Sequence, residues 1–278
     1  MKRGFTLIEV LVTMAIVSVL AGIMVPAAWK MWESQEIQTT KERLNALKLA
    51  MLGDKNLVQN GIRTSYGFVG DNGELPFGNM SARGGLKFLV DKPASGYPKW
   101  NGPYISGIDP STYSVDAWGR PFRYTLVNDQ DGYGNRYLSG EIRSAGLDGV
   151  FDNADDISVV ISDKEVAPTH RIQGNFSFAN LTGASANIEV KFSDPGSSVG
   201  ETTLASVCKS KATFPNFSSI FPNAGAPIKL PIGKLTITGN LYRNQNCTAP
   251  AGKSQYDYFV SDNVSSLFIN LPTFVPTP

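Results

Sequence analysis

The sequence predicts an α+β protein in which a long N-terminal helix packs on a small antiparallel sheet, followed by a C-terminal all-β, sandwich-like domain. Three patterns predict this class. An apolar run continues into a stretch of helical periodicity. Turn residues and a few alternating segments come next, and a longer set of alternating segments fills the C-terminal part. We expect a leader at 1–4, the helix at 5–53, a first globular domain at 54–163 and a β-extension at 164–278.

Composition sets the limits of this interpretation. The 278 residues are 42% hydrophobic, which is enough for a substantial core and is compatible with two domains. Lys and Arg total 25 against 24 Asp and Glu, for a net charge of +1, so there is no electrostatic basis for binding nucleic acid. The 27 glycines and 17 prolines indicate many turns.

The N-terminal helix begins with an apolar run from Phe5 to about Ala28. From Phe5 to Val25 a helix would span about 30 Å, the thickness of a bilayer's hydrocarbon core. The cations Lys2 and Arg3 place the short N-terminal side in the cytoplasm. A cleaved secretory signal, a plain anchor and a retained assembly helix all begin in this way. The run is long for a signal peptide and continues into an amphipathic stretch through Met51, which favours a retained helix.

Glu9 is an acid inside this apolar run, where an ionisable side chain costs several kcal/mol. A free α-amino group would be a suitable partner, and cleavage after Gly4 would create one on Phe5 of a neighbouring subunit. The alternative is a carboxyl group that reaches the membrane surface or is protonated.

The residues from Lys2 to Val10, Lys-Arg-Gly-Phe-Thr-Leu-Ile-Glu-Val, resemble the class III leader and helix of type IV pilins and type II secretion pseudopilins. The resemblance implies that a prepilin peptidase cuts between Gly4 and Phe5 and that Phe5 is N-methylated. It also implies that Glu9 neutralises the N-terminus of the adjacent subunit. Pro26 matches the family's mid-helix proline, which loosens the helix; the alternative is a simple kink at the membrane exit.

The first globular region contains two expected strands, Phe122 to Val127 and Tyr137 to Ser144. Four blocks resemble the major pseudopilin of type II secretion, and the resemblance covers roughly Phe5 to Ile157; the blocks are Asp71–Pro76, Gly85–Val90, Trp100–Ile105 and Asp116–Tyr124. In that family the aromatic blocks are structural, which assigns Trp100, Trp118 and Tyr124 to packing.

The segment from Ser144 to Ile157 gathers four aspartates and two glycines in one turn. Such a loop needs a cation or full solvation, and Ca²⁺ accepts irregular sets of six to eight oxygen ligands. The loop resembles the calcium loop of the major pseudopilin. That resemblance implies carboxylate ligands from Asp148, Asp155 and Asp156 and carbonyl ligands from Ala145 and Val150, with Asp152 as an additional candidate acting through water. The alternative is a solvated acidic turn.

The extension reads as short strands separated by turns, the pattern of an antiparallel sandwich. The expected strands are Arg171–Phe178, Ala186–Phe192, Ile228–Leu230, Lys234–Thr238, Tyr256–Val260 and Ser266–Leu271. Cys208 and Cys247 are the two cysteines and are expected to form a disulfide in an exported protein, with two buried thiols as the alternative. The single histidine, His170, is expected to be an ordinary surface residue at the linker.

No catalytic motif is visible, so we expect a structural protein and not an enzyme. The resemblance implies a pseudopilin of a type II-like secretion system, with the alternative of a type IV pilus subunit whose extension serves adhesion or surface decoration. Expected partners are copies of itself, other pilin-like subunits, the prepilin peptidase and an inner-membrane assembly platform. The chain would be anchored in the inner membrane with its globular part in the periplasm, and would then enter a periplasmic or extracellular filament.

Overall fold

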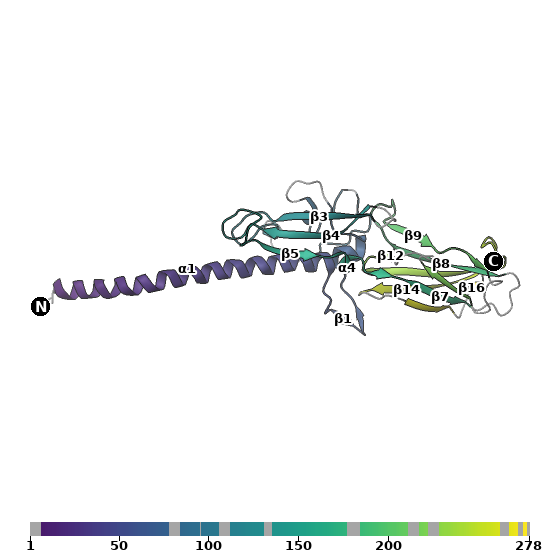
Figure 1. Cartoon of the computed structure of the whole chain (residues 1–278), viewed down its shortest axis with the longest axis horizontal. Coiled ribbons are helices and arrows are strands. Elements are labelled where there is room, and N and C mark those ends of the chain that lie inside the picture. The colour runs from purple at the N-terminus through teal and green to yellow at the C-terminus, as the bar shows by residue number, and fades with distance from the viewer. Residues whose placement is uncertain are drawn as a thin grey trace.

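The computed structural model describes residues 7–77, 84–94, 96–105, 112–130, 135–176, 184–210, 217–221, 228–261, 267–271 and 275–276. The molecule is elongated, with a long helix at one end, a first sheet along one side of the C-terminal half of that helix, and a second group of strands at the opposite end (Figure 1). This arrangement confirms the α+β class.

Helix α1 (Leu7–Leu52) is continuous, as its periodicity predicts. Its N-terminal half is exposed, whereas Leu44, Leu47 and Met51 are buried in the body. These residues are three and four positions apart and therefore share one helix face. The helix ends at Gly53, whose φ of 73° lies in the left-handed region that glycine adopts without strain.

The buried guanidinium of Arg63 fixes the end of α1. It donates hydrogen bonds to the carbonyl oxygens of Leu52, Gly53 and Ser65. Carbonyl groups in the last turn of a helix lack partners within the helix, and a cation there also suits the helix dipole. Small elements follow α1 along the chain before the first sheet: β1 (Val58–Gln59), β2 (Ile62–Arg63), α2 (Gly67–Asn72) and α3 (Gly84–Lys87).

The first sheet has the antiparallel order β3-β4-β5. Its strands are β3 (Arg123–Gln130), β4 (Asn135–Ser144) and β5 (Ile157–Ile161). The two strands expected from the sequence are confirmed as β3 and β4. Strand β5 lies along α1, where Nζ of Lys48 donates to the carbonyl oxygen of Val160 at 2.9 Å. Trp100 and Tyr124 pack against the core as expected, while Trp118 lies under the guanidinium of Arg120, 5.2 Å from its ring centre.

A short helix, α4 (Asp163–Val166), leads from the first sheet into the extension. It starts with a capping box between Ser162 and Glu165, which satisfies backbone donors at its first turn. The same glutamate pairs with Lys48 of α1, with Nζ and Oε1 2.9 Å apart. The start of the extension is therefore held against the helix.

The extension is built from two main sheets and a short pair. The larger sheet has the order β10-β8-β13-β14-β16, with β9 also paired to β8, and the smaller has the order β11-β7-β15. Strand β6 pairs with β12. The bounds are β6 (Thr169–His170), β7 (Ile172–Phe176), β8 (Ser185–Ser193), β9 (Glu201–Ala205), β10 (Lys209–Ser210), β11 (Phe217–Phe221), β12 (Ile228–Lys229), β13 (Gly233–Tyr242), β14 (Pro250–Val260), β15 (Leu267–Leu271) and β16 (Val275–Pro276).

The six strands expected in the extension are confirmed as β7, β8, β12, β13, β14 and β15, and the pattern missed β6, β9, β10, β11 and β16. The expected disulfide is also confirmed. Cys208 and Cys247, with Cα atoms 5.9 Å apart, join the β9–β10 loop to the β13–β14 loop. A cross-link over 39 residues stabilises the fold by about 3–4 kcal/mol in the chain-entropy model.

The expectation for His170 is wrong, because only 2% of this residue is exposed. The segment expected to be a surface linker instead forms β6, whose backbone pairs with β12. Alternation along β6 exposes Thr169 and turns His170 inward. The partner strand lies about sixty residues away in the chain, so local sequence carries no sign of the pairing.

Helix α2 connects the extension to the first globular region. It packs on α1 and also contacts β8 and β13. A Cβ on Gly233 would lie 2.8 Å from the Cα of Gly70, and a Cβ on Gly73 would collide with the carbonyl oxygen of Ser193. The backbones therefore meet at glycines, and the buried apolar side chains of both parts form one continuous core.

Polar contacts lie beside this joint, the place where the first globular region meets the extension. The buried Arg136 donates from Nη2 to the carbonyl oxygen of Lys229 at 2.8 Å, and its guanidinium lies 5.7 Å from the ring centre of Phe192. Glu201 of β9 pairs with Lys99 from the first region. Both contacts connect a residue of the first region to a residue of the extension.

We predict that Gly73→Ala destabilises the full chain more than Gly61→Ala does. Both glycines have positive φ, at 85° and 78°, so each alanine carries a similar backbone penalty of about 1–2 kcal/mol. Only the Cβ at position 73 also collides with the carbonyl oxygen of Ser193, while nothing lies within 4 Å of one at position 61. Denaturant unfolding of the detergent-solubilised variants measures the difference, and equal losses would contradict the close backbone contact.

Glu74 is a buried carboxyl group next to this joint. Its Oε2 accepts a hydrogen bond from the backbone N of Tyr137 at 2.9 Å. Burial raises the pKa of Glu74 to about 7, from 4.5 in the unfolded chain. The unfolded state therefore loses its proton first as the pH rises, which stabilises the unfolded state relative to the folded one.

For Glu74 we predict that the folded state loses on the order of 3 kcal/mol of stability as the pH rises from 4.5 to 7. Above pH 7 this group should cause no further loss. Glu74→Gln keeps an acceptor oxygen for Tyr137 and removes the titration. The difference in unfolding free energy between parent and variant, measured at several pH values, isolates this group from the other carboxylates. A difference that does not change across the range would show that Glu74 titrates normally.

Candidate assembly helix and acidic loop

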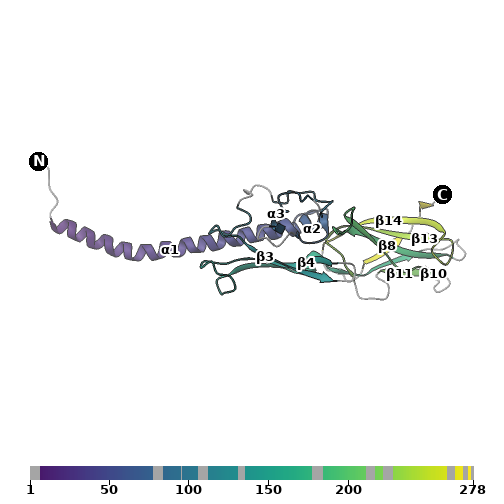
Figure 2. The same cartoon turned by 90° about the horizontal axis from the view of Figure 1, so that it is seen from above.

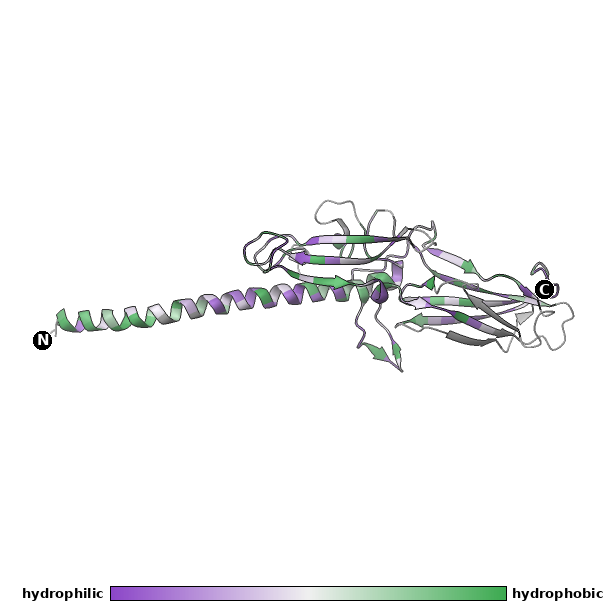
Figure 3. Ribbon diagram, viewed as in Figure 1, coloured by the Kyte–Doolittle hydropathy of each residue, from purple (hydrophilic) through white to green (hydrophobic). Residues whose placement is uncertain are grey.

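The exposed N-terminal half of α1 is almost entirely apolar (Figure 3). Within the part of the chain that the structure describes, α1 is the one helix that by length and composition could cross a membrane. Its polar hydroxyls are satisfied within the helix: Oγ1 of Thr13 donates to the carbonyl oxygen of Glu9 at 2.9 Å, and Oγ of Ser18 donates to that of Met14 at 2.8 Å. The surface of this half is thus suited to an apolar environment.

Glu9 lies in the first turn of α1 with an exposed side chain. A carboxylate at this end interacts favourably with the helix dipole. The expected cleavage residues Gly4 and Phe5 lie outside the described residues. Pro26 lies inside α1 without ending it, and the helix is gently curved (Figure 2). The missing N–H of proline removes one hydrogen bond there.

The acidic loop connects β4 to β5 beside the first sheet. Asp148 and Asp155 lie next to each other, because Oδ2 of Asp155 accepts from the backbone N of Asp148 at 3.0 Å. The oxygens of Asp148 accept from the backbone N of Val150 at 2.7 Å and from Nδ2 of Asn153 at 2.7 Å. Backbone hydrogen bonds, first that from Asp148, lower the pKa of Asp155. The carboxylate of Asp155 is therefore held ionised.

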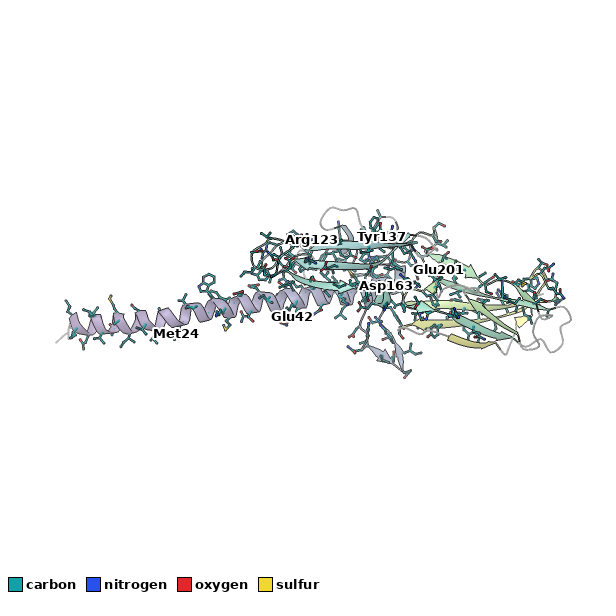
Figure 4. All side chains as sticks on the ribbon, viewed as in Figure 1. Met24, Glu42, Arg123, Tyr137, Asp163 and Glu201 are labelled. Carbon is teal, nitrogen blue, oxygen red and sulfur yellow. A yellow bond between two sulfur atoms is a disulfide. The ribbon has the colours of Figure 1, made fainter. Side chains whose placement is uncertain are left out.

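Asp152 and Asp156 are paired with arginines. Arg123, labelled in Figure 4, binds both oxygens of Asp152, and its hydrogen bond is the main cause of the lowered pKa of that carboxyl. Nη1 of Arg143 lies 3.2 Å from both Oδ1 of Asp152 and Oδ2 of Asp156. Arg123 and Arg143 are direct cross-strand partners on β3 and β4. The two aspartates thus offset the repulsion between the paired arginines Arg123 and Arg143 on the sheet.

A third arginine connects the loop to α1. Arg120 donates to the carbonyl oxygens of Gly146 and Leu147. The buried Asp116 accepts from Oγ of Ser144 and from the backbone N of Arg120, both at 2.8 Å. Its own carbonyl oxygen accepts from Arg43 of α1 at 2.7 Å. These basic partners were not expected from the sequence, although Arg143 lies in β4, the strand that leads into the loop, and Arg123 in the neighbouring strand β3.

The loop offers oxygen ligands of the kind that calcium prefers. Oδ1 of Asp156 is buried and has no hydrogen-bond partner among the described residues, which leaves a costly anionic atom for a cation to satisfy. The carbonyl oxygen of Ala145 accepts from the backbone N of Gly149 at 3.1 Å and keeps a second lone pair. No three acidic, histidine or cysteine side chains gather closely enough in the described ranges to hold a metal alone, so carbonyl and water oxygens would be needed.

Comparison with known proteins agrees with these features. The model of the prokaryotic N-terminal methylation motif matches residues 1–25, and that of type II secretion system protein G matches residues 68–162. The type II secretion system core protein G of Pseudomonas aeruginosa is 29% identical over 154 residues, which cover 54% of this chain and 92% of that protein. No solved structure matches the chain. The N-terminal part of the chain is therefore similar to protein G of type II secretion systems and carries the prokaryotic N-terminal methylation motif, and a C-terminal β-extension follows it.

Proposed function

We propose that this protein is a structural subunit of a type IV pilus-like filament and acts as a pseudopilin of a type II-like secretion system, with no chemistry of its own. The observation that carries the proposal is the exposed apolar half of α1, with Glu9 in its first turn, joined to a region that matches protein G. Before assembly the apolar half would lie in the inner membrane, with the body in the periplasm. Assembly would then transfer that half from lipid into the filament.

Processing would prepare the subunit for this transfer. A prepilin peptidase would cut between Gly4 and Phe5, and methylation of the new amine at Phe5 would follow. The freed amine of one subunit would pair with Glu9 of its neighbour, because two opposite charges in an apolar core attract each other strongly. Other pilin-like subunits and an inner-membrane assembly platform are the further partners of this step.

A surface pilus is the second candidate function. The extension lies at the end of the molecule opposite to the free half of α1 (Figure 1), so it could present a surface for adhesion or decoration. The two functions differ in where the filament lies. Loss of protein export on deletion of the gene supports secretion, whereas long surface fibres seen by microscopy support the pilus.

We predict that Glu9→Ala reduces filament formation at least tenfold while the protein still inserts in the membrane, because the neighbour's amine then lacks its counter-charge. Glu33→Ala is the matched control, since Glu33 is an exposed acid on the same helix beyond the apolar run. Filaments are counted by immunoelectron microscopy, and the mature N-terminus is read by mass spectrometry. A mature chain that starts elsewhere than Phe5, or a Glu9→Ala variant that assembles normally, contradicts the proposal.

We further propose that the acidic loop binds Ca²⁺. Asp148, Asp155 and Asp156 would supply carboxylates and Ala145 and Val150 carbonyls, and Asp152 would contribute through water. The unsatisfied Oδ1 of Asp156 and the neighbouring carboxylates of Asp148 and Asp155 support this set. The ion would stiffen the loop against the sheet, so that neighbouring subunits meet a fixed surface.

We predict that the solubilised protein melts about 5–10 °C lower in the presence of a chelator than in the presence of calcium at 100 times its Kd. Asp148→Ala and Asp155→Ala should abolish this difference and reduce assembly without blocking leader removal. Asp257→Ala is the control, because it removes a surface carboxylate that pairs with Lys234 far along the chain. A melting temperature that chelation leaves unchanged, or normal filaments from the double aspartate variant, would count against the site.

A further inference from the structure

Two exposed tryptophans mark the end of the apolar half of α1. Trp29 and Trp32 are 64% and 54% exposed, although tryptophan is a large side chain that proteins usually bury. They are three residues apart and lie on one helix face, with ring centres 5.7 Å apart. The function proposed above assigns them no role.

Their distance along the helix matches the edge of a membrane. From Leu7 to Val25 the helix rises about 27 Å, close to the hydrocarbon thickness of roughly 30 Å. Trp29 then lies about 6 Å beyond Val25 and Trp32 about 10 Å beyond it. The headgroup layer adds roughly 5–8 Å on each side of the hydrocarbon. Side chains on a helix lean toward its N-terminus, so both rings reach back toward that layer.

The charges near the pair change at the same level. Lys30 is the first cation after the apolar run, at a height where lipid phosphates lie. The residues that follow are mostly polar, with Glu33 exposed and Glu36 half-buried, and the first fully buried position after Trp32 is Thr40. A short polar stalk of about 12 Å thus separates Trp32 from the globular body.

Resting on the membrane anchoring proposed above, we propose that Trp29 and Trp32 lie in the headgroup layer of the periplasmic leaflet and set the depth of the subunit before assembly. An indole has an apolar ring and one N–H donor, and the headgroup layer satisfies both. Helix contacts within a membrane favour small residues instead, because these allow close approach of backbones. The lipid surface therefore suits this pair better than the helix of a second subunit does.

The test uses tryptophan emission from the full chain in vesicles of phosphatidylethanolamine and phosphatidylglycerol. The spectrum of Trp29→Phe/Trp32→Phe is subtracted from that of the parent, which removes the contribution of Trp100 and Trp118. Lipids brominated near the headgroup should quench this difference at least twofold more than lipids brominated deep in the chain. Equal quenching, stronger deep quenching or no quenching would overturn the proposal.

Two further tryptophans, each introduced alone into the Trp29→Phe/Trp32→Phe variant, calibrate depth once the spectrum of that variant has been subtracted. Ile16→Trp lies in the middle of the apolar half and should be quenched mainly by the deep label, and Gln38→Trp lies on the stalk and should be quenched by neither. If the Ile16→Trp probe is also not quenched, the helix is not in the bilayer and the membrane anchoring itself fails. If it is quenched as expected and the native pair is not, only the depth-setting role is wrong.

Discussion

The burial of the last turns of α1 is the contact on which the rest of the molecule depends. Leu44, Leu47 and Met51 place the helix under the first sheet, and Lys48 holds β5 and α4 from the same helix. Burying three such side chains contributes several kcal/mol. Because α1 is continuous and its last turns are buried, its exposed apolar half extends away from the globular part (Figure 1). One helix thereby serves as core element and as free anchor.

The extension shares this foundation through α2. Its strands β8 and β13 meet α2 at glycine contacts, and its buried side chains continue the core of the first region. Two parts that share an apolar interface with charged pairs at its edge move together more than domains that are joined only by a linker. The first region and the extension are therefore expected to behave as one packed unit on the C-terminal half of α1.

Local sequence predicted the elements well and their contacts poorly. The periodicity through Met51, the break at Gly53 and the alternation of β8 and β13 depend on neighbours within a few residues, and all three are present in the structure. The burial of His170 depends on a strand about sixty residues away, and the acidic loop's arginines depend on cross-strand register. The sequence showed the aspartates but not their partners, because pairing across a sheet leaves no local pattern.

The acidic loop shows why four aspartates can stand in fourteen residues. Arg123 and Arg143 neutralise Asp152 and one oxygen of Asp156, and the backbone N–H groups of the loop support the other two acids. This division leaves Oδ1 of Asp156 buried and without a hydrogen-bond partner among the described residues. The calcium ion proposed above would satisfy that oxygen, and it would do so at the end of the hydrogen-bond chain that leads through Asp116 to α1.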